Sequence, residues 1–425
     1  MATGIPTCIN SNVDDDLSFS LNYNGKNSKE DIINNTSNAD VQQVIGITGN
    51  PENRLYFGDN LHILRSLMGD PKIFGNVKLI YIDPPYAKKA RFNSRSQEHA
   101  YSDTLFGSKY IEFLRQRLII MRELLAEDGS IYVHLDSTMA FPIKIIMDEV
   151  FGEHNFRNWI TRKKCNPKNY TKKQYGNISD YILFYSKTKD FTFNQPYIPW
   201  DEGTGNKEYQ YVEEKTGRRY KKVPIHAPGV RNGETGKEWR GMMPPVGKHW
   251  QYTPEKLDEF DKKGEIYWSP TGNPRRKVYL DNSKGIPVQD IWMNFKDAHN
   301  QNVKITGYPT EKNEEMLKQI VLASSNKGDL VLDAFAGSGT TLAVAETLGR
   351  KWIGIDNSEL SIRTILNRLI NGSEKMGDFI ENRKKKSLQT ELFANRILMS
   401  GLKVYVDSEV NTSLDELNTW KKIVE

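Results

Sequence analysis

Apolar residues follow two patterns along the chain, and the two patterns alternate. Short, mostly apolar runs, which are typical of strands buried in a parallel sheet, occupy residues 54–60, 77–83, 130–135, 329–333 and 351–356. Apolar residues three or four positions apart, which predict helices, occupy residues 61–68, 110–125, 141–150 and 310–324. Strands that alternate with helices indicate an α/β fold with a doubly wound, mainly parallel sheet.

The strand at 77–83 runs into the tetrapeptide Asp83-Pro84-Pro85-Tyr86. Proline has no backbone N–H group, so strand pairing stops there and the turn is stiff. Open α/β sheets bind their ligands at the carboxyl ends of parallel strands. The Asp83 carboxylate, a proline carbonyl and the Tyr86 ring suit a planar ring that carries an NH₂ group. An ordinary strand-to-loop turn accounts for these four residues equally well.

A second turn, after the strand at 329–333, contains Gly337 and Gly339. Glycine permits positive φ and close approach of a ligand, and the N-terminus of the following helix favours a carboxylate. Thr340 stands where a phosphate-binding loop needs lysine, and Leu342 stands where a dinucleotide fingerprint needs glycine or alanine. S-adenosylmethionine remains as the cofactor that this turn suits.

Two further carboxylates lie at strand ends. Asp356 is seventeen residues past Gly339, where a carboxylate accepts hydrogen bonds from ribose hydroxyls, although an N-cap for the next helix is the alternative. Asp59 ends the strand at 54–60, where it either caps the following helix or lines the pocket for an adenine ring.

The middle of the chain differs in composition from both ends. Residues 161–175 carry six basic residues and no acid, and six of the eight tryptophans fall within 157–300. Basic residues mixed with aromatic ones suggest a nucleic-acid-binding insert, although a solvated basic face over a small β core is the alternative. Residues 87–106 read as a basic lid or a solvated loop. The DNA-contact candidates are Lys88, Lys89, Arg91, Arg162, Lys163, Lys164, Lys168, Lys172 and Lys173.

Composition narrows the class of protein further. The 425 residues suffice for two or three domains, and the formal charge of +5 is only mildly basic. We expect no membrane span and no secretory signal, because neither an apolar run of sufficient length nor a charged start followed by an apolar stretch occurs. The two cysteines form no pair motif, which fits a cytoplasmic protein without a metal site.

Taken together, Asp83-Pro84-Pro85-Tyr86 and Asp333-Ala334-Phe335-Ala336-Gly337-Ser338-Gly339 resemble the amino-methyltransferases of DNA. The tetrapeptide comes some 250 residues before the glycine turn, as in the permuted β class, in which a target-recognition domain separates the two halves. Residues 307–312 and 239–250 resemble modification subunits of type III restriction systems and their solitary relatives. Asn313 departs from the proline that is usual in that family after Thr-Glu-Lys.

The resemblance implies a permuted, Rossmann-like S-adenosylmethionine-dependent methyltransferase sheet and transfer of a methyl group to N6 of an adenine flipped out of duplex DNA. Asp83 and the Pro84 carbonyl would orient the amine. The implied catalytic residues are Asp83, Pro84, Pro85 and Tyr86, and the implied cofactor-binding residues are Asp59, Thr310, Lys312, Asp333, Phe335, Ala336, Gly337, Ser338, Gly339 and Asp356.

We therefore expect five segments along the chain. These are a flexible leader (1–45), the catalytic half (46–156), a target-recognition insert (157–300), the cofactor-binding half (301–372) and a C-terminal extension (373–425). The implied partners are duplex DNA, a second copy of the chain and a restriction subunit, in the cytoplasm at the nucleoid. Cytosine-N4 methylation, methylation of RNA or protein, and a non-catalytic DNA-binding module are the alternatives.

Overall fold

The computed structural model describes residues 20–49, 53–85, 90–93, 99–103, 107–167, 173–297, 304–305, 311–371, 374–375 and 401–425. The chain divides into two compact units, Met1–Asn194 with Gln289–Glu425, and Gln195–Val288. In the part of the chain that the structure describes, no helix is long and apolar enough to cross a membrane.

The first unit is built on a ten-stranded sheet in which only β1 and β8 run against the other strands. This arrangement confirms the doubly wound, mainly parallel sheet and the five strands that the apolar runs predict. In spatial order the strands are β1 (Val41–Ile47), β22 (Leu402–Asp407), β2 (Asn53–Phe57), β20 (Lys351–Asp356), β19 (Leu330–Asp333), β3 (Val77–Ile82), β6 (Leu125–Leu135), β8 (Ser179–Ser186), β7 (Phe156–Lys163) and β17 (Ile291–Trp292).

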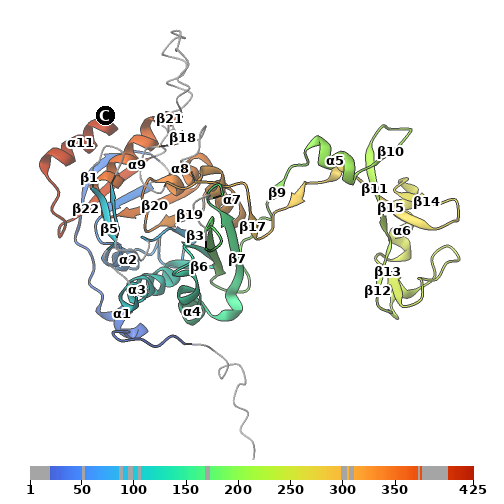
Figure 1. The fold of residues 1–425 in the computed structure, drawn as a ribbon, viewed down its shortest axis with the longest axis horizontal. Coiled ribbons are helices and arrows are strands. Elements are labelled where there is room, and N and C mark those ends of the chain that lie inside the picture. Colours follow the sequence, from blue (N-terminus) through green and yellow to red (C-terminus); the bar gives the residue numbers. More distant parts are fainter. Residues whose placement is uncertain are drawn as a thin grey trace, which may run out of the picture. The chain divides into compact units, whose positions relative to one another are not determined.

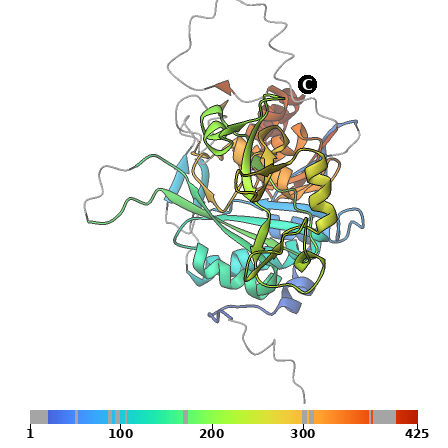
Figure 2. The same ribbon diagram turned by 90° about the vertical axis from the view of Figure 1, so that its right-hand side faces the viewer.

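Helices cover both faces of this sheet (Figures 1 and 2). One face carries α2 (Asn60–Leu67), α3 (Ser108–Leu124) and α4 (Ala140–Phe151), and α1 (Lys29–Asn35) packs against α3. The other face carries α7 (Glu314–Ser324), α8 (Thr340–Thr347) and α9 (Glu359–Asn371), and α11 (Leu414–Val424) packs against α9. The core therefore lies in two layers, one on each side of the strands.

The order of the strands reverses between β3 and β19. From β3 the chain crosses through α3 to β6 on one side, and from β19 it crosses through α8 to β20 on the other. The two strands are parallel neighbours, with Ile80 opposite Leu332, so their carboxyl ends lie side by side. In a doubly wound sheet such a reversal marks the place where a ligand binds.

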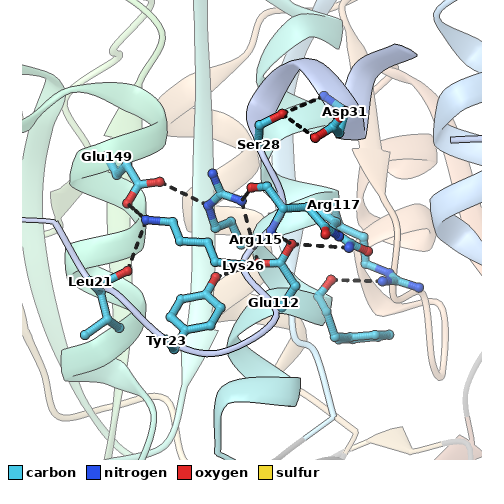
Figure 3. A network of polar contacts seen from close by, with 12 residues as sticks. Leu21, Tyr23, Lys26, Ser28, Asp31, Glu112, Arg115, Arg117 and Glu149 are labelled. Carbon is cyan, nitrogen blue, oxygen red and sulfur yellow. Dashed lines mark hydrogen bonds and ion pairs between the residues drawn. The ribbon is translucent and has the colours of Figure 1, made fainter. Parts of the chain in front are cut away.

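The segment before the first predicted strand is part of the fold from residue 20 onward, so the prediction of a flexible leader over 1–45 was wrong for residues 20–45. Residues Val41–Ile47 form β1, at one edge of the large sheet. The Tyr23 hydroxyl donates to Glu112 over 2.6 Å and the Lys26 ammonium donates to Glu149 over 2.7 Å (Figure 3). Many of these contacts are polar, so hydrophobic patterning gives little sign of them. Residues 1–19 lie outside the described residues.

The C-terminal residues likewise complete the first unit. Strand β22 lies between β1 and β2, and the Trp420 indole of α11 is fully buried. The prediction of a separate extension over 373–425 was therefore wrong for 402–424. In the rest of that segment the structure describes residues 401 and 425 and the strand β21 (Glu374–Lys375). Strand β21 pairs with β18 (Lys304–Ile305).

The second unit has its own small core of Ile225, Trp239, Trp250, Leu257, Phe260 and Ile266. It is narrower than the predicted insert of 157–300, because β7, β8 and β17 belong to the large sheet. Its helices are α5 (Glu202–Glu208) and α6 (Pro254–Lys262). Its strands are β9 (Tyr197–Ile198), β10 (Tyr211–Val212), β11 (Arg219–Pro224), β12 (His226–Pro228), β13 (Lys248–Trp250), β14 (Ile266–Trp268), β15 (Pro274–Tyr279) and β16 (Ile286–Pro287).

The predicted lid at 87–106 lies mostly outside the described residues. The described part is an antiparallel pair, β4 (Ala90–Asn93) and β5 (His99–Asp103). Three single-turn 3₁₀ helices, Glu153–Asn155, Glu234–Gly236 and Leu280–Asn282, complete the elements of the two units.

Candidate active site

Asp83 follows β3 directly and lies at the strand reversal. Its Oδ2 forms an ion pair with the Lys312 Nζ over 2.8 Å, and both side chains are largely buried. Its Oδ1 is buried and has no hydrogen-bond partner among the residues that the structure describes. A buried acceptor without a partner is costly, so this oxygen is a candidate for binding a donor on a ligand. Pro84 and Pro85 end the strand as predicted, and Tyr86 lies outside the described residues.

Lys312 thus contacts the carboxylate of the tetrapeptide, whereas the resemblance placed it with the cofactor. The ion pair fixes the orientation of the Asp83 carboxylate, with Oδ2 toward Lys312. The neighbouring Thr310 lies outside the described residues.

Beneath Asp83, a buried polar chain crosses the sheet from β3 to β7. The Tyr81 hydroxyl is hydrogen bonded to His134 Nδ1 over 2.8 Å, and His134 Nε2 lies 3.0 Å from Asp180 Oδ2. Although burial acts to raise it, the neighbouring His134 and Arg162 hold the pKa of Asp180 well below its usual range. These buried polar contacts hold the strands next to the tetrapeptide in position relative to one another.

Arg162 belongs to this row of buried polar side chains, so its prediction as a DNA contact was wrong. Its side chain is fully buried, and it pairs with Asp180 over 3.0 Å and with Asp297 over 2.7 Å. Lys163 and Lys164, half-buried, and Lys173, exposed, stay predictions as DNA contacts. The structure does not describe Lys88, Lys89, Lys168, Lys172 or the side chain of Arg91.

The glycine turn has the backbone that the sequence predicts. Gly337 and Gly339 have φ of 51° and 72°, in the left-handed region. A Cβ on Gly339 would lie 2.8 Å from Ile365 Cγ1 of α9, so a side chain there would clash. The Gly337 N–H group donates to Asp356 Oδ2 over 2.8 Å, and the Ser338 hydroxyl is hydrogen bonded to Thr340. Helix α8 starts directly after Gly339.

Two carboxylates at this turn bind protons more tightly than usual. Burial raises the pKa of Asp333 to about 7, and the nearby charges of Asp83 and Asp356 act in the same direction. Burial also raises the pKa of Asp356 to about 6. Asp356 Oδ1 accepts from the Ser358 N–H group over 3.0 Å, so this carboxylate is a cap for the chain that follows it. Its oxygens retain lone pairs for a further donor.

Asp59 also has a structural role. Its Oδ1 accepts from the Leu61 N–H group over 2.7 Å and so caps α2. The same oxygen forms an ion pair with Arg117 Nη2, 3.0 Å away. The Asp59 side chain is 49 % exposed, so a carboxylate surface stays open to a ligand. The cap that we gave as one alternative is confirmed, and the binding role stays a prediction.

Two buried arginines beside the site were missed. Arg368 Nη1 of α9 donates to Glu311 Oε1 over 2.8 Å and to the Thr340 hydroxyl over 2.9 Å, and Arg117 of α3 contacts both Asp59 and Asn60. A cation on the apolar stripe of an amphipathic helix is the signal that could have revealed both arginines, since a buried charge needs a partner.

These contacts test whether the residues fit S-adenosylmethionine. Gly339, which has no side chain, and the carboxylates of Asp333 and Asp356 lie at one edge of the sheet. Carboxylates suit a cofactor with a sulfonium charge and ribose hydroxyls, so the donor set fits. Within the described ranges, no group of His, Cys, Asp and Glu is placed to hold a metal ion.

A doubly wound sheet with an Asp-Pro-Pro turn beside a glycine turn is the arrangement that the resemblance to amino-methyltransferases implies. Residues 77–367 match the model of the N6_N4_Mtase family, described as DNA methylase, and the chain belongs to this family. It is a DNA methyltransferase, and S-adenosylmethionine is the methyl donor of the family.

Relatives of known name agree with this assignment. The type II methyltransferase M.EcaI of Enterobacter cloacae is 50 % identical over 365 residues, which are 86 % of this chain and 79 % of that protein. The DNA adenine methyltransferase YhdJ of Escherichia coli K12 is 28 % identical over 80 % of this chain and 90 % of its own length. The type III StyLTI Mod subunit of Salmonella typhimurium is 28 % identical, and the chain spans 49 % of its length.

Among solved structures, the M1.HpyAVI–SAM complex matches with 16 % identity and a TM-score of 0.41, covering 74 % of this chain and 98 % of that one. The cytosine-N4-specific PvuII DNA methyltransferase matches with 15 % identity and a TM-score of 0.45, covering 88 % of this chain and all of that one.

Proposed function

We propose that this protein methylates N6 of adenine at specific sites in duplex DNA. The observation that carries the proposal is Asp83 Oδ1, a buried acceptor without a partner among the described residues, at the strand end next to the glycine turn. An exocyclic amine is the donor that such an oxygen suits. The similarity to YhdJ, a DNA adenine methyltransferase, and the aspartate at the first position of the tetrapeptide support adenine over cytosine.

The amine of adenine is a weak nucleophile because its lone pair is delocalised into the ring. Asp83 Oδ1 and the Pro84 carbonyl would accept hydrogen bonds from the two N–H groups of the amine. These bonds would direct the nitrogen lone pair away from the ring plane. Lys312 fixes the orientation of the Asp83 carboxylate through Oδ2. S-adenosylmethionine, when bound, would supply the methyl group from its sulfonium, whose sulfur would be left as a neutral thioether without help from an acid. The methylated nitrogen would then lose its surplus proton to Asp83 or to water. Positioning and electrostatics are therefore the contribution of the chain.

The amine of a paired adenine is not accessible, so the base has to leave the helix. Unstacking and unpairing cost a few kcal/mol, and stacking on an aromatic ring returns roughly 1–3 kcal/mol. Tyr86 is our candidate for that ring. We further propose a restriction-modification role, on the similarity to M.EcaI and the Mod subunits, with a restriction subunit and a second copy of the chain as candidate partners.

The test is mass spectrometry of DNA nucleosides after incubation of genomic DNA with the protein and labelled S-adenosylmethionine. We expect N6-methyladenine from the wild type, no product from Asp83→Ala, and undiminished cofactor binding by Asp83→Ala in calorimetry. Finding 4-methylcytosine would change the base. Label in RNA or protein, or full activity in the variant, would refute the proposal.

A further inference from the structure

We infer that Arg117 is a positioning residue for the cofactor site, and that it acts through Asp59, Asn60 and Phe113. The inference rests on the proposed use of S-adenosylmethionine at the strand reversal. Arg117 lies on α3, outside every motif that the sequence offers, and its side chain is only 3 % exposed. Figure 3 shows it beside the contacts that join α3 to the N-terminal segment.

The first contact leads to the end of β2. The Arg117 Nη2 donates to both oxygens of Asp59, over 3.0 and 3.4 Å. Asp59 is also held by the Leu61 N–H group, so the carboxylate is fixed from two sides and its open edge has one orientation. A planar guanidinium gives this kind of geometric definition, which the flexible ammonium of lysine does not.

The second contact leads to the end of β19. The Arg117 Nε donates to Asn60 Oδ1, and the Asn60 amide donates in turn to the Ala334 carbonyl over 2.6 Å. Ala334 is the first residue after β19 and opens the glycine turn. Arg117 therefore fixes the position of a turn that lies more than two hundred residues away in the sequence.

The third contact is with the Phe113 ring, which in turn packs against Phe335. The guanidinium lies 3.6 Å from the centroid of the Phe113 ring, and its Nη1 donates to the Phe113 carbonyl over 2.9 Å. The Phe113 ring meets the Phe335 ring edge-on, with 6.2 Å between centroids. One buried cation thus orders three parts of the cofactor site, namely Asp59, Ala334 and Phe335.

A cation this deeply buried is expensive to hold. Burial lowers the pKa of Arg117 to about 10, because its carboxylate partner offsets only part of the lost hydration. A hydrophobic residue at this position of α3 would pack with less penalty, which favours a role for the cation beyond the stability of the helix.

The test compares Arg117→Met with Arg115→Met in the full-length protein. Arg115 lies on the same helix, is 5 % exposed, and donates to the Asn27 carbonyl and to Glu149, away from the strand reversal. Both variants should lower the unfolding temperature. Only Arg117→Met should weaken S-adenosylmethionine binding in calorimetry, by roughly tenfold or more, since it loses several charge-assisted hydrogen bonds. Its KM for the cofactor should rise, while kcat and the KM for DNA stay within twofold.

Arg117→Lys is the second variant, and it carries the test if the methionine variant does not fold. Lysine keeps the charge near Asp59 but cannot serve Asp59 and Asn60 together, so we expect a smaller loss of cofactor affinity. Wild-type affinity in Arg117→Lys and Arg117→Met, or an equal loss in Arg115→Met, would overturn the inference. Failure of the wild type to bind S-adenosylmethionine would instead refute the proposed function.

Discussion

The replacement Asp333→Asn separates the charge of a buried carboxylate from its shape. The Asp333 side chain is 2 % exposed, and its Oδ1 accepts from the Phe335 N–H group over 3.0 Å. Asparagine has the same size and keeps an oxygen for that hydrogen bond, but it cannot ionise. The pH-dependent part of its effect on stability should therefore report the charge of Asp333.

The structure gives the size of that effect. The ordinary pKa of 3.8 and the folded value of about 7 correspond to roughly 4 kcal/mol at 1.36 kcal/mol for each tenfold change in proton affinity. Because the folded state binds the proton more tightly, this stabilisation is fully present below pH 3.8 and is lost as the pH rises through about 7. At pH 8 the wild type holds a buried charge that the variant lacks.

Urea unfolding followed by circular dichroism at pH 5, 6, 7 and 8 measures the difference. The free energy of unfolding of Asp333→Asn should exceed that of the wild type at pH 8, by a margin that shrinks toward pH 5. Equal pH dependence in the two proteins would refute the reasoning. A buried carboxylate that lowers the free energy of unfolding near neutral pH indicates a functional role. Proteins tolerate such a loss of stability at a position where the negative charge binds a cationic ligand.

Three further predictions follow from the same contacts. Gly339→Ala should destabilise the protein by roughly 1–3 kcal/mol and weaken cofactor binding, because φ is 72° and the new Cβ meets Cγ1 of Ile365. Ile365→Ala removes that Cγ1, so the same glycine change should cost less in thermal unfolding when it is made in the Ile365→Ala protein, and an equal cost in both backgrounds would show that the clash is not the cause. Cofactor affinity of the wild type should rise with pH through about 6, because the protonated Asp356 uses one oxygen as a donor whereas the ionised form accepts with both; calorimetry on Asp356→Asn should lose the rise near pH 6, and parallel profiles would exclude this carboxylate. Lys163→Gln with Lys164→Gln should lower the slope of log affinity for DNA on log salt by about 2, and an unchanged slope would remove both from the DNA contacts.

The sequence predicts most of the first unit because its strands are fully buried. Runs such as Leu79–Ile82 have side chains in contact with helices on both faces, and such runs are apolar throughout. The glycine turn is equally visible, since the positive φ of Gly339 and its approach to Ile365 leave no room for another residue. Both features are local, and each leaves a mark on its own stretch of sequence.

The features that the sequence missed depend on contacts between distant residues. Strand β1 has only one buried residue, Ile45, and it acquires its place from pairing with β22, more than three hundred residues later. Arg117 and Arg162 look like surface cations, and only the folded structure gives them carboxylate partners. A charge count assigns such residues to solvent or to DNA, because it contains no information on burial.

The second unit lies in sequence between the Asp-Pro-Pro turn and the glycine turn, and its structure explains why this insertion does not disturb the site. Strands β9 and β16 pair with Tyr197 opposite Pro287, so the two ends of this unit are held together by its own backbone. For the first unit, the insertion therefore amounts to a short connection between β8 and β17, and the entropy of closing a longer loop would in any case grow only slowly with its length. The neighbours β3 and β19 are set by pairing within the sheet and do not depend on the order of the chain. For this reason the Asp-Pro-Pro turn and the glycine turn can lie side by side although some 250 residues separate them.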